Sequence, residues 1–209
     1  MTKTLKIWGR ISSINVKKVV WAAQELGLDF ERIDAGRAFG NTSTPEYLGH
    51  NPNGAIPLID DDGFMLWESN VITRYLCAKH SHNRLYPDAL HARFNAERWM
   101  DWQQAHLNPA GREAFVQWFR TPVEARRPDL IAQSISATEP YMAMLDHHLG
   151  RNAFMAGDQF TMADIPIGCE VHRWWGLPQA RPPRPHIDRW YDCMQARPAA
   201  LGILDLPLS

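Results

Sequence analysis

Apolar and polar residues alternate along the first 80 positions in a pattern that predicts short strands between helices. Leu5–Trp8 is typical of a strand, and the valines and alanines of residues 16–23 recur at the spacing of one helix face. Phe30–Asp34 is typical of a second strand, and Gly36–Thr44, rich in Gly, Ser and Thr, is typical of a loop. The residues from there to position 54 hold at most one helical turn.

The stretch GAIPLIDDDGFMLWESN, residues 54–70, predicts a β-hairpin followed by a helix. Two short apolar runs flank an Asp-Gly pair, the usual turn of a two-stranded hairpin. Pro57 stands at the start of the first run, where it removes a backbone donor from the ladder. A helix is expected from Ser69 to about Lys79. The order β-α-β-(short α)-β-β-α predicts a small mixed sheet that carries helices.

After residue 88 the strand patterns stop and the apolar spacing becomes helical. A long amphipathic helix is expected over residues 89–107, and the pattern allows it to continue with a kink beyond Asn108-Pro109. A second long helix is expected from Pro128 to Gly150, and two more follow. We therefore expect an α/β domain with a mixed four-stranded sheet over residues 1–80, a linker over 81–88 and an all-α domain over 89–209.

Composition narrows the class of protein. The 209 residues are 45% hydrophobic and 22% charged, the balance of a soluble globular protein. Lys+Arg 22 against Asp+Glu 23 leaves no basic excess, so we expect no nucleic-acid partner. No apolar run is long enough to cross a bilayer, and the N-terminal residues lack the apolar core of a signal peptide. A cytoplasmic protein without a membrane partner is expected.

Cysteine and histidine spacing predicts neither a disulfide framework nor a metal site. The three cysteines are far apart and lack a Cys-x-x-Cys pair, so we expect them to be small buried hydrophobic residues. The histidine pairs at residues 80–82 and 147–148 have no carboxylate or cysteine at ligand spacing. We expect no metal.

Two stretches of the predicted hairpin carry candidate chemistry. The Ile56-Pro57 bond is a candidate for the cis isomer, which would turn the Ile56 backbone toward an extended peptide-like ligand; an edge strand that tolerates proline is the alternative. Ser69 is a good helix N-cap, and capping alone would explain it. Alternatively, the helix N-terminus holds a ligand carboxylate, Ser69 adds its hydroxyl and Glu68 pairs with a ligand ammonium. Such a ligand has the α-carbon of an amino acid.

Ser13 lies in the loop between the first strand and the first helix. On turn statistics, Ser12 and Ser13 are ordinary loop or capping residues. If a thiol binds there, a hydroxyl at a helix N-terminus can stabilise the thiolate. Lowering a thiol pKa by about two units takes about 2.7 kcal/mol. One hydrogen bond to a charged group supplies about 1.5–3 kcal/mol and a helix terminus about 0.5 kcal/mol, so the sum is sufficient without a metal.

Together these stretches resemble the cytosolic glutathione S-transferase family, and their sequences are most similar to its bacterial theta-like branch. The segments NPNGAIPLI, ESNVITRYL and GDQFTMADI carry the resemblance, which covers nearly the whole chain. It implies a thioredoxin-like N-terminal domain, a helical C-terminal domain, glutathione as co-substrate, a small hydrophobic electrophile, a homodimer and a role in detoxification.

The resemblance also implies roles for the candidate residues. Glu68 and Ser69 would hold the γ-glutamyl group of glutathione, and the Ile56 backbone, before a cis Pro57, would pair with its cysteinyl unit. Ser13 aligns with the catalytic serine of the family. The margin is one residue, so Ser12 is a rival and Asn15 could assist. The residue before Ile56 is Ala55, where the family often has Lys or Gln, so how the glycine end is held is left open.

The helical domain supplies further candidates by the same resemblance. The first long helix borders the electrophile pocket in this family, and an ordinary helix face is the alternative for each of its candidates: Trp102, His106, Arg112 and Phe115. In GDQFTMADI, Thr161 would cap a helix, Asp164 would reach back and Phe160 would act as the hydrophobic staple. Conjugation of glutathione is the leading function. Dehalogenation, peroxide reduction or isomerisation by the same thiolate, or a non-catalytic binding module, are the alternatives.

Overall fold

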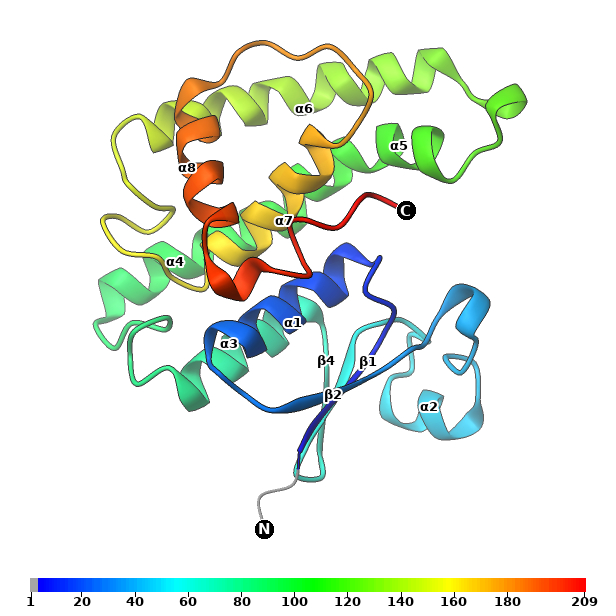
Figure 1. Ribbon diagram of the computed structural model, residues 1–209, viewed down its shortest axis with the longest axis vertical. Helices are drawn as coiled ribbons and strands as arrows, with labels where there is room; N and C mark the ends of the chain where they lie inside the picture. The colour runs from blue at the N-terminus through cyan, green and yellow to red at the C-terminus, as the bar shows by residue number, and fades with distance from the viewer. Residues whose placement is uncertain (1–3) are drawn as a thin grey trace. The chain divides into compact units, whose positions relative to one another are not determined.

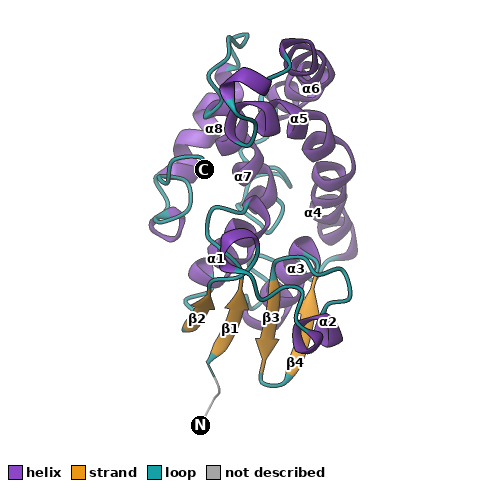
Figure 2. Cartoon of the chain, turned by 90° about the vertical axis from the view of Figure 1, so that its right-hand side faces the viewer, coloured by secondary structure: helices purple, strands orange, loops and turns teal. Residues whose placement is uncertain are grey.

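The computed structural model describes residues 4–209, which divide into two compact units on either side of Tyr86 and Pro87. The first unit contains four strands, three α-helices and a short 3₁₀ turn, Arg37–Phe39. Their bounds are β1 Leu5–Trp8, α1 Ile14–Glu25, β2 Phe30–Ile33, α2 Pro45–His50, β3 Leu58–Asp61, β4 Phe64–Trp67 and α3 Ser69–His80. The strand order in the sheet is β2-β1-β3-β4 (Figure 2).

The sheet of the first unit is mixed, as its sequence predicts. Strand β1 runs parallel to β2 and antiparallel to β3, and β3 forms the expected hairpin with β4. The turn residues Asp62 and Gly63 have φ values of 55° and 89°, the conformation that favours Asp-Gly in a two-residue hairpin turn. The Gly63 N–H also donates a hydrogen bond to Asp60 Oδ1 at 2.6 Å.

Different helices lie on the two faces of this sheet. Leu5, Ile7 and Ile59 are buried, and helices α1 and α3 pack side by side over one face (Figure 1). Helix α2 lies toward the opposite face, where it borders an open pocket of about 410 Å³ whose lining includes Trp8 and Leu58. Helix α2 has six residues, slightly more than the single turn that the sequence predicts.

The second unit is helical, as expected. Its helices are α4 Leu90–Trp102, α5 Asn108–Phe119, α6 Pro128–Leu149, α7 Asp164–Trp175 and α8 Pro185–Gln195. Between α4 and α5 the chain stays helical through a π-helix, η2, at Gln103–Leu107. The expected kink near Pro109 is therefore a change of helix type just before the proline. Helix α5 packs along α6 (Figure 1).

The predicted reach-back of Asp164 to Thr161 is present, but Thr161 is not the N-cap of α7: the helix begins at Asp164 and its N-cap residue is Ala163. The Asp164 carboxylate accepts the Thr161 N–H at 2.9 Å, and the Thr161 hydroxyl accepts the Ala163 N–H at 3.3 Å. The same carboxylate accepts bonds from the Met155 N–H and from the Trp190 indole, at 2.9 and 3.0 Å. Burial raises the pKa of Asp164 to about 6, although these bonds act in the opposite direction.

One expectation about the cysteines is wrong. Cys77 and Cys169 are buried, but Cys193 is exposed, because it lies on the outer face of α8. Burial raises the pKa of the Cys77 thiol to about 12. Within residues 4–209, no helix is both long enough and apolar enough to span a membrane.

Candidate functional site

The three candidate stretches of the first unit meet at one edge of its sheet. Trp8, the last residue of β1, pairs with Leu58, the first residue of β3, and Leu58 also pairs with Trp67, the last residue of β4. The residues just beyond these strand ends are therefore neighbours at the same edge. They are the loop that leads to Ser13, the Ile56-Pro57 pair and the Glu68-Ser69 pair.

The Ile56-Pro57 peptide bond is cis, as the sequence predicts. Ile56 is half-buried and Pro57 is buried, directly before the first residue of β3. Among the described residues, main-chain hydrogen bonds outside helices and strands include none from the N–H or to the C=O of Ile56. These two groups lie at the sheet edge and can pair with an extended ligand.

The residue before this pair is anchored to α2. The Ala55 carbonyl accepts hydrogen bonds from the Tyr47 hydroxyl at 2.7 Å and from the Asn51 amide at 2.8 Å. Burial raises the pKa of Tyr47 to about 12, so its hydroxyl stays a donor at neutral pH. Sequence reasoning missed both anchors. The Asn-Pro-Asn-Gly run at residues 51–54 was the available signal, because the Asn51 side chain accepts the Asn53 N–H at 3.1 Å, as in an Asx turn.

Two glycines bring the first loop against Ile56. A Cβ at Gly9, where φ is 151°, would lie 2.4 Å from Cγ2 of Val16 and 3.4 Å from Cβ of Ile56. A Cβ at Gly36 would lie 3.2 Å from Cδ1 of Ile56 and 3.1 Å from a guanidinium nitrogen of Arg10. The absence of a Cβ at these two positions therefore lets the side chains of Val16, Arg10 and Ile56 pack directly against the backbone that follows β1 and β2.

Ser13 occupies the N-cap position of α1. It has extended backbone angles, φ −84° and ψ 124°, and its side chain makes no capping hydrogen bond. Its carbonyl accepts the Lys17 N–H at 2.9 Å, so the backbone completes the helix start without the hydroxyl. Ser12 is also half-buried. The Oδ1 atom of Asn15 is buried with no hydrogen-bond partner in the described structure, so both rivals that the sequence left open lie within the same turn.

The Glu68-Ser69 pair corrects one expectation. Ser69 is the first residue of α3 rather than its N-cap; the N-cap is Glu68, with φ 74° and ψ 107°. A positive φ at a residue other than glycine is uncommon and is often found where a backbone clamps a ligand. The Glu68 side chain is exposed, whereas Ser69 is only 4% exposed. The pair thus offers a carboxylate in solvent and a hydroxyl at the positive end of a 12-residue helix.

The structure does not gather the four electrophile-site candidates on one surface. The rings of Trp102 and His106 lie 5.9 and 6.0 Å from the ring of Tyr141 on α6. Phe115 lies instead beneath the guanidinium of Arg173 on α7, at 5.6 Å, and stacks on Phe119. The Arg112 side chain is exposed. The four candidates therefore form two pairs: Trp102 and His106 lie against Tyr141, and Arg112 and Phe115 are three residues apart on α5.

Within residues 4–209 there is no group of three or more His, Cys, Asp or Glu side chains arranged to hold a metal ion.

Comparison with known proteins identifies the family. Residues 3–78 match the glutathione S-transferase N-terminal domain, and residues 128–193 match the C-terminal domain. "Glutathione S-transferase GstB" of Escherichia coli K12 is 38% identical over 207 residues, which cover 98% of this chain and 100% of that protein. "Glutathione S-transferase 3" of Zea mays is 31% identical over an alignment that covers 93% of this chain and 90% of that protein.

A solved structure gives the same result. The theta class glutathione S-transferase of Xanthomonas axonopodis pv. citri with glutathione bound has a TM-score of 0.95 and 37% identity, with 100% of both chains covered. The chain therefore belongs to the glutathione S-transferase family, and the resemblance to that family and the fold class drawn from the sequence are confirmed.

Proposed function

We propose that this chain binds glutathione at the sheet edge of its first unit, stabilises the thiolate with Ser13 and conjugates it to a small hydrophobic electrophile. One observation carries the proposal: Ser13, the unbonded Ile56 backbone and the Glu68-Ser69 pair lie beyond strand ends that are paired with one another. The transferases among its relatives and the glutathione-bound neighbour support the same reaction class.

Two parts of the site bind glutathione: the N-terminus of α3 and the backbone of Ile56. The γ-glutamyl carboxylate lies at the N-terminus of α3, where free N–H groups and the Ser69 hydroxyl donate to it, and Glu68 pairs with the ammonium group. The N–H and C=O of Ile56 pair with the cysteinyl unit as a short added strand. Ala55 has no side-chain donor for the glycine carboxylate, and its carbonyl is engaged by Tyr47 and Asn51. A modest affinity for glutathione follows.

The chemical step is nucleophilic substitution or addition by sulfur. The thiol proton leaves to solvent, and the Ser13 hydroxyl donates a hydrogen bond to the thiolate that remains. A hydroxyl that caps no backbone group keeps its donor for this purpose. The thiolate then attacks an electrophilic carbon; a C–S bond forms and the leaving group departs with its electron pair, or an activated double bond takes up a proton. No oxidant is required.

The electrophile is placed against the helical unit, with Phe115 and Arg112 of α5 as its proposed contacts. The rings of Trp102 and His106 lie against Tyr141 instead, so we assign them a smaller role in contacting the electrophile. A cytoplasmic homodimer remains a prediction from the family. Exposed apolar side chains on β4 and α3, Phe64 at 49% and Val71 at 43%, support the dimer, and light scattering of the purified chain tests it.

The test of the proposal compares three single variants. Calorimetry measures glutathione binding, and the ultraviolet absorbance of the thiolate against pH gives the pKa of the bound thiol. Wild type is expected to bind glutathione and to lower that pKa. Ser13→Ala is expected to bind with similar affinity but to raise the pKa of the bound thiol by about one to two units. Ser12→Ala and Asn15→Ala are the matched controls.

The outcome assigns the thiolate donor. If Ser13→Ala keeps the wild-type thiol pKa and full turnover with halogenated, epoxide, peroxide and unsaturated acceptors, while Ser12→Ala or Asn15→Ala loses them, Ser13 is not the catalytic residue. No heat with millimolar glutathione would show that the sheet edge does not bind it.

A further inference from the structure

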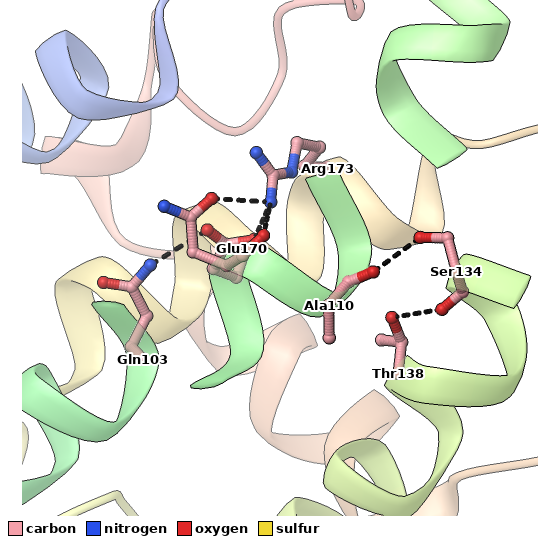
Figure 3. Close-up of polar contacts among 7 residues, drawn as sticks. Gln103, Ala110, Ser134, Thr138, Glu170 and Arg173 are labelled. Carbon is pink, nitrogen blue, oxygen red and sulfur yellow. Dashed lines mark hydrogen bonds and ion pairs between the residues drawn. The ribbon is translucent and has the colours of Figure 1, made fainter. Parts of the chain in front are cut away.

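A buried ion pair lies in the second unit, between Glu170 and Arg173 of α7 (Figure 3). The Arg173 guanidinium donates a 2.6 Å bond to the Glu170 carboxylate, and the two side chains are only 7% and 4% exposed. Replacing a buried ion pair with apolar residues of similar size is often neutral or stabilising, so stability alone is a weak reason to keep one. Its contacts point to a geometric role.

The pair holds both ends of the π-helix η2. The Gln103 side-chain amide, in the first residue of η2, donates to Glu170 Oε1 at 2.9 Å (Figure 3). Arg173 donates to the carbonyl of Asn108 at 3.3 Å and to its Oδ1 at 3.0 Å, and Asn108 is the residue directly after η2. One ion pair on a neighbouring helix thus fixes where the π-helix starts and where it ends.

A π-helix needs such support. Its i→i+5 bonding is rare and occurs mostly as single turns, frequently at functional sites. Pro109, the second residue after η2, supplies no N–H to the turn before it. The extra residue in a π turn rotates the following helix by about 100° relative to an unbroken α-helix. The presence of η2 therefore decides which face α5 presents.

Helix α5 is held in that rotation from two sides. On the α7 side, Arg173 lies over the Phe115 ring at 5.6 Å, and the Trp174 ring is 3.3 Å from where a Cβ of Gly111 would lie. On the α6 side, the Ser134 hydroxyl donates to the Ala110 carbonyl at 2.5 Å (Figure 3). A shift of α5 would break contacts on both sides at once.

We propose that Glu170 and Arg173 are positioning residues for the electrophile site. By fixing η2 they set the rotation of α5, and with it the directions of Phe115 and Arg112. This inference rests on the proposed function, in which α5 contacts the electrophile. The residues proposed to bind glutathione all belong to the first unit, so the pair affects the electrophile and leaves glutathione affinity unchanged.

The test replaces both charges at once, Glu170→Leu with Arg173→Met, so that no buried charge is left alone. Calorimetry measures the affinities for glutathione and for S-hexylglutathione, and their ratio reports the site of the apolar group without turnover. Wild type is expected to bind S-hexylglutathione more tightly. In the double variant that preference is expected to fall about tenfold, while glutathione affinity changes less than about twofold.

The matched control is a part-buried ion pair of the same unit, Arg184 and Glu139, joined at 2.8 Å between α6 and the N-cap residue of α8. Glu139→Leu with Arg184→Met removes the same charges away from η2 and is expected to leave both affinities unchanged. Arg173→Lys keeps the charge but not the fork of donors, and serves if the double variant does not fold. Its ligand preference is expected to fall about threefold.

The results distinguish failure of the positioning role of Glu170 and Arg173 from failure of the proposed function. If wild type prefers S-hexylglutathione and neither Arg173→Lys nor the double variant changes that preference, the pair is structural only and the inference is wrong. A wild type that binds both ligands equally also contradicts it. A wild type that binds neither contradicts the proposed function itself, and a loss of glutathione affinity equal to that for S-hexylglutathione would show general damage rather than positioning.

Discussion

The Tyr47 hydroxyl donates a 2.7 Å hydrogen bond to the Ala55 carbonyl, so a helix on one face of the sheet holds the residue that precedes the cis Ile56-Pro57 bond. This bond and the parallel one from Asn51 orient the peptide plane just before the groups that are proposed to pair with glutathione. The conformation of the proposed binding strand thus depends on a residue eight positions earlier in the chain.

Replacing Tyr47 with phenylalanine is expected to weaken glutathione binding about fivefold and to lower the free energy of unfolding by about 1 kcal/mol, because one donor to a part-buried carbonyl is lost. Calorimetry and urea unfolding measure the two effects. Tyr75→Phe is the matched control, since the Tyr75 hydroxyl donates to Asp61 at 2.6 Å at the opposite end of the sheet. It should lose stability without losing affinity. Equal losses of affinity in both variants would contradict the anchoring role.

Ser69→Ala is expected to reduce glutathione affinity by about tenfold or more with little change in stability. The structure gives the reason: Ser69 is the first helical residue and not the cap, so alanine removes a ligand donor without removing a capping bond. Calorimetry and thermal unfolding are the measurements. Ser134→Ala, which loses a hydroxyl bonded to the Ala110 carbonyl, should show the reverse pattern. If Ser69→Ala destabilises the fold and binds normally, the residue serves the helix alone.

Asp164 is expected to make stability depend on pH. Its folded-state pKa is raised from 3.8 to about 6, so the folded chain holds the proton more tightly than the unfolded chain. The stabilisation is complete below about pH 3.8 and is lost as pH rises through about 6, with an upper limit of about 3 kcal/mol. Urea unfolding between these values measures it.

The control for this pH dependence is a second capping carboxylate. Asp164→Asn should lose the dependence and be less stable at neutral pH, because both carboxylate oxygens accept hydrogen bonds and the amide has only one acceptor oxygen for the Thr161 N–H and the Trp190 indole. Asp146→Asn should lose about 1 kcal/mol of capping at the start of α8 and keep the dependence. Identical slopes in wild type and Asp164→Asn would show that this carboxyl does not titrate as proposed.

One of the three thiols is expected to react rapidly with an aromatic disulfide reagent in the native protein. Cys193 is exposed, whereas Cys77 and Cys169 are buried and the Cys77 thiol has a pKa of about 12. Counting released thiolate by absorbance should give one equivalent when folded and three in denaturant. Cys193→Ala should abolish the fast phase, and a fast phase that survives would place a second thiol within reach of solvent.

The sequence was sufficient where a local rule applies. The Asp-Gly turn, Pro57 before β3 and the hydrogen bond from the Thr161 N–H to Asp164 all follow from residues within a few positions of one another. The assignment of Ser69 failed by one residue, because Glu68 takes a positive φ that no propensity predicts for glutamate. The exposure of Cys193 depends on the rotation of α8 within its bundle.

The electrophile candidates show why helical spacing was not enough. Trp102 and Phe115 belong to the long helix that the sequence predicts with a kink at Asn108-Pro109, but η2 lies between them and changes the phase of the helix. The π-helix η2 is held here by Glu170 and Arg173, which lie 67 and 65 residues further along the chain than their partners Gln103 and Asn108. Contacts of that sequence separation cannot be read from one pattern of apolar positions.

At Gly9 only a hydrogen atom fits beside Val16. Any substitution at this position would push the start of α1 away from the sheet. The loop that contains Ser12 and Ser13 would move with it. Gly9→Ala adds no charge or polar group, yet it should impair stabilisation of the glutathione thiolate as much as loss of the Ser13 hydroxyl does. Libraries built to broaden acceptor range should leave this position fixed and vary α5 instead.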